Sequence, residues 1–202
     1  MFLVVATKNQ KKLGEIKEIL RGFNFKLRSL ADYGKTPDVV EDGVTFKENA
    51  IKKALELAHF TGELTLGEDS GLCVDALGGR PGVYSSRFAG ESKSDEKNNQ
   101  KLLRLLKDTP LNKRRAHYVC AVALADKHGL IGVVEGKCYG RIDFELKGNH
   151  GFGYDPLFLI PKFKKTFGEL DEKIKHTMSH RYRALNKAKK VLLKYVENKK
   201  SN

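Results

Sequence analysis

Strand-like and helix-like segments alternate through the first third of the chain, and this order constrains the fold more than any other feature. Residues 2–6 form an unbroken apolar run with the length and composition of a buried strand. Apolar side chains then recur at helical spacing over residues 13–20, and residues 27–30 return to a strand-like pattern. Residues 46–58 are helical in pattern again. Helices that alternate with strands in this way pack on the faces of a sheet.

The middle of the chain predicts a long β-hairpin. Residues 118–125 form a nearly continuous strand-like run, residues 126–129 read as a turn, and residues 130–135 return as a strand. Strands joined by so short a turn pair antiparallel. The sequence therefore predicts an α/β fold, a mixed sheet with packed helices and a central cleft between two lobes.

The composition limits the classes of protein to which the chain can belong. The 202 residues are 40% hydrophobic and 31% charged, as in an ordinary globular chain, and no repeat or linker-like tract is visible, so one domain over residues 1–202 is expected. No apolar run approaches the ~20 residues of a membrane span, and no secretory signal is expected. Three widely spaced cysteines, Cys73, Cys120 and Cys138, suit a reducing cytoplasm.

Positive charge is concentrated near the end of the chain. The net charge is +13, and residues 162–202 hold 13 basic and 4 acidic side chains, which is nine of those thirteen charges. Nucleic acid, nucleotides or acidic surfaces could all bind such a region. The alternative is a helix with one apolar stripe and a solvated basic face, and charge alone does not establish a nucleic-acid-binding protein.

A candidate phosphate site follows the first predicted strand. The polar segment Thr7-Lys8-Asn9-Gln10-Lys11-Lys12 leads into a helix. Backbone N–H groups at a helix start, together with lysines, bind anions, although the P-loop pattern is absent from the sequence. The alternative is that Thr7 or Asn9 caps the helix.

Two acidic segments predict a metal site. Glu68-Asp69-Ser70-Gly71 lies between the apolar runs 64–66 and 72–74, and is expected to form a sharp break between two strands. Adjacent carboxylates repel unless a cation is near, and Mg²⁺ bound to one or two carboxylates plus substrate phosphates would serve. Glu41-Asp42-Gly43 could supply a second carboxylate. Turns are the alternative for both segments, and Glu48 is expected to complete a capping box with Thr45.

Two later segments resemble the walls of a ligand pocket. Residues 151–156 place Phe152, Tyr154 and Asp155 among glycines, and an aromatic face beside a polar side chain suits a purine base. Ser179-His180-Arg181 opens the last helix. The alternatives are core packing for Phe152 and a local hydrogen bond for His180.

Six motifs in fixed order resemble one known family. They are T-x-N-x-x-K, E-D-G-x-T-F-x-E-N-A, E-D-S-G-L, A-L-G-G-R-P-G-V-Y-S-S-R, G-F-G-Y-D-P and S-H-R-x-x-A, and they run from the first strand to about Ala188. This arrangement is similar to the inosine triphosphate pyrophosphatases, which hydrolyse non-canonical purine nucleoside triphosphates.

The resemblance implies a role for each matching residue. It implies Mg²⁺ bound by Glu41 and Asp69, with Asp69 also the general base. Lys175 is preferred to Lys173 because its offset of four from Ser179 fits the family. The substrate-binding residues that it implies are Thr7, Lys8, Asn9, Gln10, Lys11, Lys12, Lys53, Ser70, Phe152, Gly153, Tyr154, Asp155, Lys175, His180 and Arg181.

The resemblance also implies a reaction and its setting. Water attacks the α-phosphorus of inosine, deoxyinosine or xanthosine triphosphate, and pyrophosphate and a monophosphate leave. A donor from Arg181 or Lys175 to the base O6 would disfavour adenine. A cytoplasmic homodimer is implied, with residues 79–87 a candidate contributor, and no stable nucleic-acid partner. The competing interpretations are an RNA- or nucleotide-binding module without catalysis, and a pyrophosphatase for other bases such as modified pyrimidines.

Overall fold

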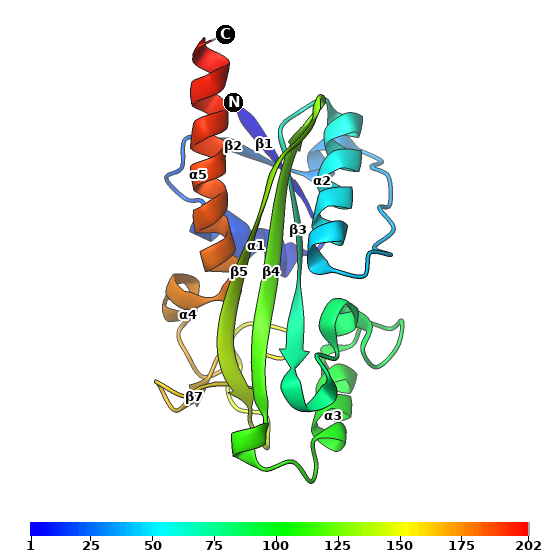
Figure 1. Cartoon of the computed structure of the whole chain (residues 1–202), viewed down its shortest axis with the longest axis vertical. Helices are drawn as coiled ribbons and strands as arrows, with labels where there is room; N and C mark the ends of the chain where they lie inside the picture. Colours follow the sequence, from blue (N-terminus) through cyan, green and yellow to red (C-terminus); the bar gives the residue numbers. More distant parts are fainter. Residues whose placement is uncertain (202) are drawn as a thin grey trace. The chain divides into compact units, whose positions relative to one another are not determined.

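The computed structural model describes residues 1–201, and these form a mixed α/β structure (Figure 1). The strands are β1 (Phe2–Ala6), β2 (Lys26–Ser29), β3 (Thr65–Val74), β4 (Arg115–Asp126), β5 (Gly129–Ile142), β6 (Phe158–Ile160) and β7 (Lys165–Thr166). The helices are α1 (Gln10–Ile19), α2 (Phe46–Thr61), α3 (Asp95–Leu105), α4 (Glu172–Met178) and α5 (His180–Ser201). Short 3-10 turns η1 (Leu30–Tyr33), η2 (Asp75–Leu77), η3 (Gly82–Arg87) and η4 (Leu111–Lys113) lie between them.

The strands form a seven-stranded sheet in the order β2-β1-β3-β4-β5-β6-β7. β1 pairs parallel with β2 and β3, whereas β6 pairs antiparallel with β5 and β7. β4 and β5 are neighbours joined through Lys127 and His128, as the predicted hairpin requires. The predicted mixed sheet with packed helices is therefore confirmed.

The chain divides into two compact units. The first unit contains residues 1–69, residues 120–136 and the chain from Arg181 onward. The second unit contains Ser70–Val119 and Lys137–His180. The strands β3, β4 and β5 therefore each contribute residues to both units.

In the first unit, alternate side chains of β1 pack into different apolar clusters. Leu3 and Val5 of β1 pack in one core with apolar side chains of α1 and α5, whereas Val4 and Ala6 pack with Leu57 of α2. Figure 1 shows α2 on one side of these strands and α1 and α5 on the other. The predicted apolar stripe of α5 is confirmed, because Ala184, Leu185, Ala188 and Leu192 are fully buried.

A glycine lets α2 lie close to β3. A Cβ at Gly67 would lie 2.3 Å from the carbonyl oxygen of Ala50 and 2.6 Å from the amide nitrogen of Ala54. Both partners are helix backbone, so any other residue would push α2 away. The predicted capping box fixes the start of this helix, with Thr45 accepting from the amide of Glu48 at 3.2 Å.

The predicted break at residues 68–71 is wrong. β3 runs unbroken from Thr65 to Val74 and includes both carboxylates. The side chains of Glu68 and Asp69 are buried in the strand because each contacts side chains that compensate its charge. Local turn preference is thus overridden by tertiary partners.

The second unit has its own apolar core. Leu72 and Val74 of β3 pack with Leu102 of α3, and the rings of Tyr118 and Phe158 meet in a tilted arrangement with their centres 4.6 Å apart. Among the helices of residues 1–201, none combines the length and apolar character needed to cross a bilayer.

Candidate functional site

The segment after β1 is shaped by side-chain caps. Thr7 Oγ1 accepts from the amide of Asn9 at 3.1 Å, and Asn9 Oδ1 accepts from the amide of Lys12 at 3.1 Å. The capping alternative is thereby confirmed for Asn9, which is the N-cap of α1. Lys8 contacts Asp38, and Gln10 and Lys11 are exposed at the helix start.

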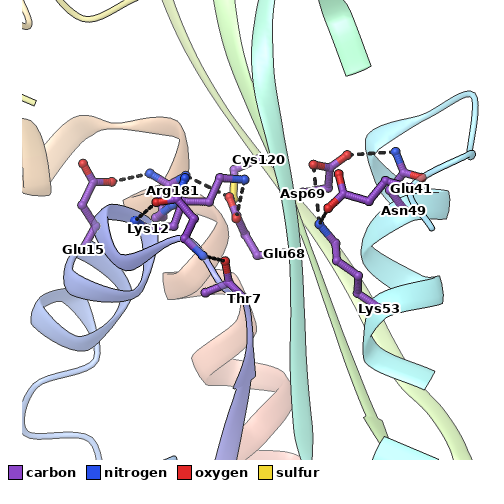
Figure 2. Close-up of polar contacts among 11 residues, drawn as sticks. Thr7, Lys12, Glu15, Glu41, Asn49, Lys53, Glu68, Asp69, Cys120 and Arg181 are labelled. Atoms are coloured by element: carbon purple, nitrogen blue, oxygen red, sulfur yellow. Dashed lines mark hydrogen bonds and ion pairs between the residues drawn. The ribbon is translucent and has the colours of Figure 1, made fainter. Parts of the chain in front are cut away.

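Lys12 instead extends to Glu68. Its ammonium lies 3.1 Å from Glu68 Oε2, and Arg181 Nη2 lies 3.0 Å from Glu68 Oε1 (Figure 2). The side chains of Glu68 and Arg181 are each only 1% exposed. Arg181 Nη1 contacts Glu15, one turn along α1 from Lys12. Two carboxylates and two cations thus form one buried network.

Burial and charge set the protonation states of this network. Burial lowers the pKa of Lys12, but the charges of Glu68 and Asp69 outweigh it and the pKa is raised overall. The same competition raises the pKa of Arg181. Burial, followed by the charge of Glu68, raises the pKa of Cys120, whose thiol donates to Glu68 at 3.3 Å. The cysteine therefore stays a neutral donor, and Lys12 stays cationic.

Asp69 faces the opposite side of β3, toward α2 (Figure 2). Lys53 Nζ of α2 lies 3.7 Å from Asp69 Oδ1 and 3.0 Å from Glu41 Oε1, so one ammonium lies between the two carboxylates. Asn49 Nδ2 donates to Asp69 Oδ2 at 3.1 Å, and Asn49 Oδ1 accepts from the amide of Gly43 at 2.8 Å. Asn49 thereby ties the segment carrying Glu41 to β3.

The two carboxylates differ in their protonation energetics. Burial raises the pKa of Asp69 in spite of the lysines Lys53 and Lys12. Burial acts in the same direction on Glu41, but the charge of Lys53 outweighs it and the pKa is lowered. Burial therefore dominates at Asp69, whereas the lysine charge dominates at Glu41.

The donor set suits a hard cation. Within residues 1–201 no group of three or more histidine, cysteine or acidic side chains could hold a metal. Glu41 and Asp69, however, converge on a single cationic atom, the ammonium of Lys53. Carboxylate oxygens from one or two residues, completed by ligand oxygens and water, are what Mg²⁺ usually takes from a protein. The residues present therefore fit Mg²⁺.

In the second unit, Asp155 organises the predicted base pocket. Its Oδ2 accepts from the amide of Phe152 at 2.9 Å and contacts Lys175 Nζ at 2.7 Å. The side chains of Asp155 and Lys175 are each only 3% exposed. Lys175 Nζ also lies 5.2 Å from the ring centre of Phe152, which is half-buried. A Cβ at Gly151 would lie 2.1 Å from Asp155 Oδ2, so only glycine fits there.

The remaining predicted residues have separate environments. Tyr154 is a core residue whose hydroxyl donates to the carbonyl of Ser85 at 2.8 Å, and burial raises the pKa of this hydroxyl. His180 is buried with its ring stacked on Tyr118 at 4.6 Å. Gly153 is half-buried in the loop, and Ser70 is half-buried on β3.

The predicted residues thus fall into two groups. Residues 7–12, Glu41, Lys53, Asp69 and Arg181 belong to the first unit. Ser70, residues 152–155, Lys175 and His180 belong to the second.

Glu15 and Asn49 were not predicted from the sequence, and Glu68 was named only within the acidic segment, without its buried partners Lys12 and Arg181. Reading residues 65–74 as one strand would have placed Glu68 and Asp69 on opposite faces, each in need of its own partner. Glu15 follows Lys12 by three residues, on the same face of α1. Asn49 lies within the motif E-N-A, but an uncharged side chain gave no sign of a role in the site.

These features define an α/β protein whose buried lysines and carboxylates are of the kind that bind phosphates and hard cations. The chain belongs to the Ham1 family, whose model matches residues 3–191. It is 52% identical over 192 residues to a dITP/XTP pyrophosphatase of Desulforamulus reducens, covering 95% of this chain and 96% of that protein.

Other relatives agree with this membership. The chain is 48% identical over 196 residues to a dITP/XTP pyrophosphatase of Exiguobacterium sibiricum, covering 97% of this chain and 99% of that one. The structure of a HAM1 protein from Coxiella burnetii superposes with a TM-score of 0.87 at 38% identity, covering 96% of this chain and all of that one. The resemblance predicted from the six motifs is confirmed.

Proposed function

We propose that the chain is a nucleoside triphosphate pyrophosphatase that cleanses the nucleotide pool. Its substrates are dITP, ITP and XTP, and its products are pyrophosphate and the nucleoside monophosphate. The relatives named dITP/XTP pyrophosphatase support the substrate class. The observation that carries the proposal is the position of Lys53 between Glu41 and the buried Asp69, whose pKa is raised by burial.

Asp69 is the general base. Asn49 holds one of its oxygens and Lys53 approaches the other, so the direction of the carboxylate is defined before substrate arrives. A raised pKa makes an ionised carboxylate a better proton acceptor at neutral pH. Asp69 takes the proton of the water that attacks the α-phosphorus.

Glu41 and Asp69 would together hold Mg²⁺. When bound, the ion lowers the pKa of a coordinated water and offsets charge on the phosphates. Lys53 supports both carboxylates, with its ammonium 3.0 Å from Glu41 Oε1 and 3.7 Å from Asp69 Oδ1.

The triphosphate binds at the start of α1. The segment from Thr7 to Lys12 offers the amide groups of a ten-residue helix, and Lys8, Lys11 and Lys12 add positive charge. Lys12 remains positively charged beside Glu68, because its pKa is raised.

The base lies against Phe152. Lys175 is held by Asp155 and lies 5.2 Å from the centre of the Phe152 ring, so it is the better candidate than Arg181 for the donor to the base O6. Both terminal nitrogens of Arg181 contact carboxylates, which favours a role in holding Glu68 and α1. Gly153, Ser70 and His180 complete the nucleotide site, and Tyr154 supports the loop from the core.

The wider setting is part of the same proposal. Residues 1–202 act as one catalytic domain, the chain works as a cytoplasmic homodimer, and it has no stable nucleic-acid partner. The basic face of α5 is explained by solvation, since the opposite face fills the core.

A substrate panel tests the proposal. The chain is incubated with Mg²⁺ and the triphosphates of hypoxanthine, xanthine, adenine, guanine and a modified pyrimidine, and pyrophosphate release is measured. We expect kcat/KM for dITP and XTP to exceed that for ATP by ~10²-fold or more, because a donor facing the adenine amino group is left unpaired. A preference for the modified pyrimidine triphosphate would contradict the proposed purine substrates. Release of orthophosphate without pyrophosphate would contradict the proposed reaction.

A further inference from the structure

Helix α3 holds the proposed base-binding loop although it contributes none of the predicted site residues. Asp95 is the first residue of α3, and Asn99 follows one turn later on the same face. Asp95 Oδ2 accepts from the amide nitrogen of Gly153 at 2.9 Å, and Asn99 Nδ2 donates to the carbonyl oxygen of Gly153 at 2.9 Å. Both backbone groups of a single loop residue are therefore bound by one helix.

These contacts fix the backbone on both sides of Phe152. The amide of Phe152 donates to Asp155 Oδ2, and the next amide in the chain, that of Gly153, donates to Asp95. Gly153 has a φ of +63°, which glycine adopts readily and other residues do not. With both neighbouring peptide groups held, the direction in which the Phe152 side chain leaves the backbone is set.

The helix that supplies these contacts is firmly anchored. Leu102 of α3 is fully buried in the core of the second unit. Asn98, the neighbour of Asn99, binds a different segment: it accepts from the amide of Ala89 at 2.7 Å and donates to the carbonyl of Ser86 at 3.0 Å. The two adjacent asparagines thus hold two separate segments.

Asn99 is a poor choice for stability alone. The residue is only 4% exposed, and within residues 1–201 its Oδ1 is buried without a hydrogen-bond partner. An unsatisfied buried acceptor lowers stability, whereas an apolar side chain of similar shape would not. Because Asn99 lowers stability in this way, its presence is better explained by the hydrogen bond that it donates to Gly153.

We propose that Asp95 and Asn99 are positioning residues that place Phe152 for stacking on the purine base, and so set the affinity for the base. The inference rests on the proposed function, in which Phe152 contacts the base. Neither residue touches the reacting phosphates in this account, so their loss acts on KM and leaves kcat largely intact.

The first test replaces each contact selectively. We expect Asn99→Ala to raise KM for dITP about 2- to 10-fold, as the loss of one hydrogen bond does, with kcat changed less than twofold. Asn99→Asp removes the donor but keeps the shape, so it should be at least as harmful. Asp95→Asn keeps an acceptor for the Gly153 amide and should retain the wild-type KM, whereas Asp95→Ala should raise it.

Asn98→Ala is the matched control. It removes a buried asparagine with two hydrogen bonds from the same helix turn, so it should lower stability at least as much as Asn99→Ala but leave KM unchanged. Equal increases of KM in the two variants would show a general effect of loosening α3 and overturn the proposal. Because Asp95 is exposed at the helix start, the Asp95 variants decide the question if an asparagine variant fails to fold.

A second readout is independent of activity. Amide hydrogen exchange of Gly153 should accelerate in Asp95→Ala, which removes the acceptor of that amide, and exchange of Ala89 should accelerate in Asn98→Ala instead. Unchanged exchange at Gly153 would overturn the positioning role, and so would faster exchange with an unchanged KM. If the wild-type chain hydrolysed no purine triphosphate, the proposed function would fail while exchange still reported whether α3 holds the loop.

Discussion

Glu68 and Asp69 are adjacent acidic residues with different partners. Successive side chains of a strand point to opposite faces, and β3 uses this to separate them. Glu68 lies among Lys12, Arg181 and Cys120, whereas Asp69 lies between Asn49 and Lys53. The first carboxylate compensates buried cations, and the second is oriented as a base.

Glu68→Gln should therefore destabilise the fold. The amide still accepts a hydrogen bond but supplies no charge to two buried cations, and breaking a buried ion pair costs roughly 3 kcal/mol or more. Urea denaturation at pH 7 measures the loss. Activity per folded molecule should persist, because Asp69 is unchanged.

Asp69→Asn is the control for that comparison. Burial raises the pKa of Asp69, which means that its ionised form is less favourable in the folded chain than in the unfolded chain. Above the folded pKa this charge lowers stability, and so its removal at pH 7 should leave the free energy of unfolding equal or higher. A larger loss of stability in Asp69→Asn than in Glu68→Gln would contradict these assignments.

Phe152 and Tyr154 make a second contrasting pair. Phe152→Ala should raise KM for dITP at nearly constant kcat, since base stacking contributes roughly 1–3 kcal/mol. Tyr154→Phe should instead lose about 1 kcal/mol of stability, because its hydroxyl donates to the Ser85 carbonyl, with KM unchanged. Steady-state kinetics and denaturation of both variants check this. A raised KM in Tyr154→Phe with only a loss of stability in Phe152→Ala would contradict both assignments.

The candidate residues were predictable from the sequence, but their partners were not. The motif G-F-G-Y-D-P pointed to Phe152, Tyr154 and Asp155 together, and only burial separates the core tyrosine from the half-buried phenylalanine. Lys12 and Arg181 were expected to contact substrate, yet both also contact Glu68, which lies far from each along the chain. Contacts between distant segments leave no local pattern to read.

Individual helices and strands were predicted correctly where the sequence has a regular apolar spacing or a capping motif. The strand 2–6, the capping box at Thr45 and the apolar stripe of α5 all follow from short-range rules. The two ends of β3 were predicted as separate strands because Asp-Ser-Gly favours a turn locally. The lysines and the arginine that stabilise a continuous buried strand there come from three helices. Ion pairs with distant residues therefore determine that β3 is continuous.

The docking of α5 on β4 gives a pH-dependent prediction. Burial raises the pKa of Asp126, but the hydroxyl of Tyr195, which donates at 2.7 Å, and the amide of His128 outweigh it and lower the pKa overall. A lowered carboxyl pKa contributes stability that is present above its ordinary value of 3.8 and is lost as the pH falls through the folded pKa.

Tyr195→Phe should accordingly lose about 1 kcal/mol of stability at pH 7. The difference from wild type should shrink as the pH falls below 3.8, the ordinary carboxyl pKa. Denaturation across this range measures it, with Tyr139→Phe, an exposed tyrosine, as control. A difference that is independent of pH would show that Asp126 is not the partner that matters.

At the scale of the whole molecule, a chain of net charge +13 concentrates its buried carboxylates around lysines and an arginine. The proposed chemistry requires a divalent cation at Glu41 and Asp69. Excess chelator should therefore abolish turnover of dITP, and added Mg²⁺ should restore it. Full activity in chelator would remove the metal from the account, and steep salt-dependent binding of RNA without turnover would favour the non-catalytic alternative.

The most direct measurement compares pyrophosphate release from dITP by the wild-type chain and by Asp69→Asn at saturating Mg²⁺. Asparagine keeps the shape of the side chain but can neither accept the proton of water nor contribute its charge. We predict a fall in kcat of at least ~10²-fold with the fold intact, the range expected for loss of a general base. A folded Asp69→Asn variant that retained more than about a tenth of the wild-type kcat would contradict the assignment of Asp69 as the base.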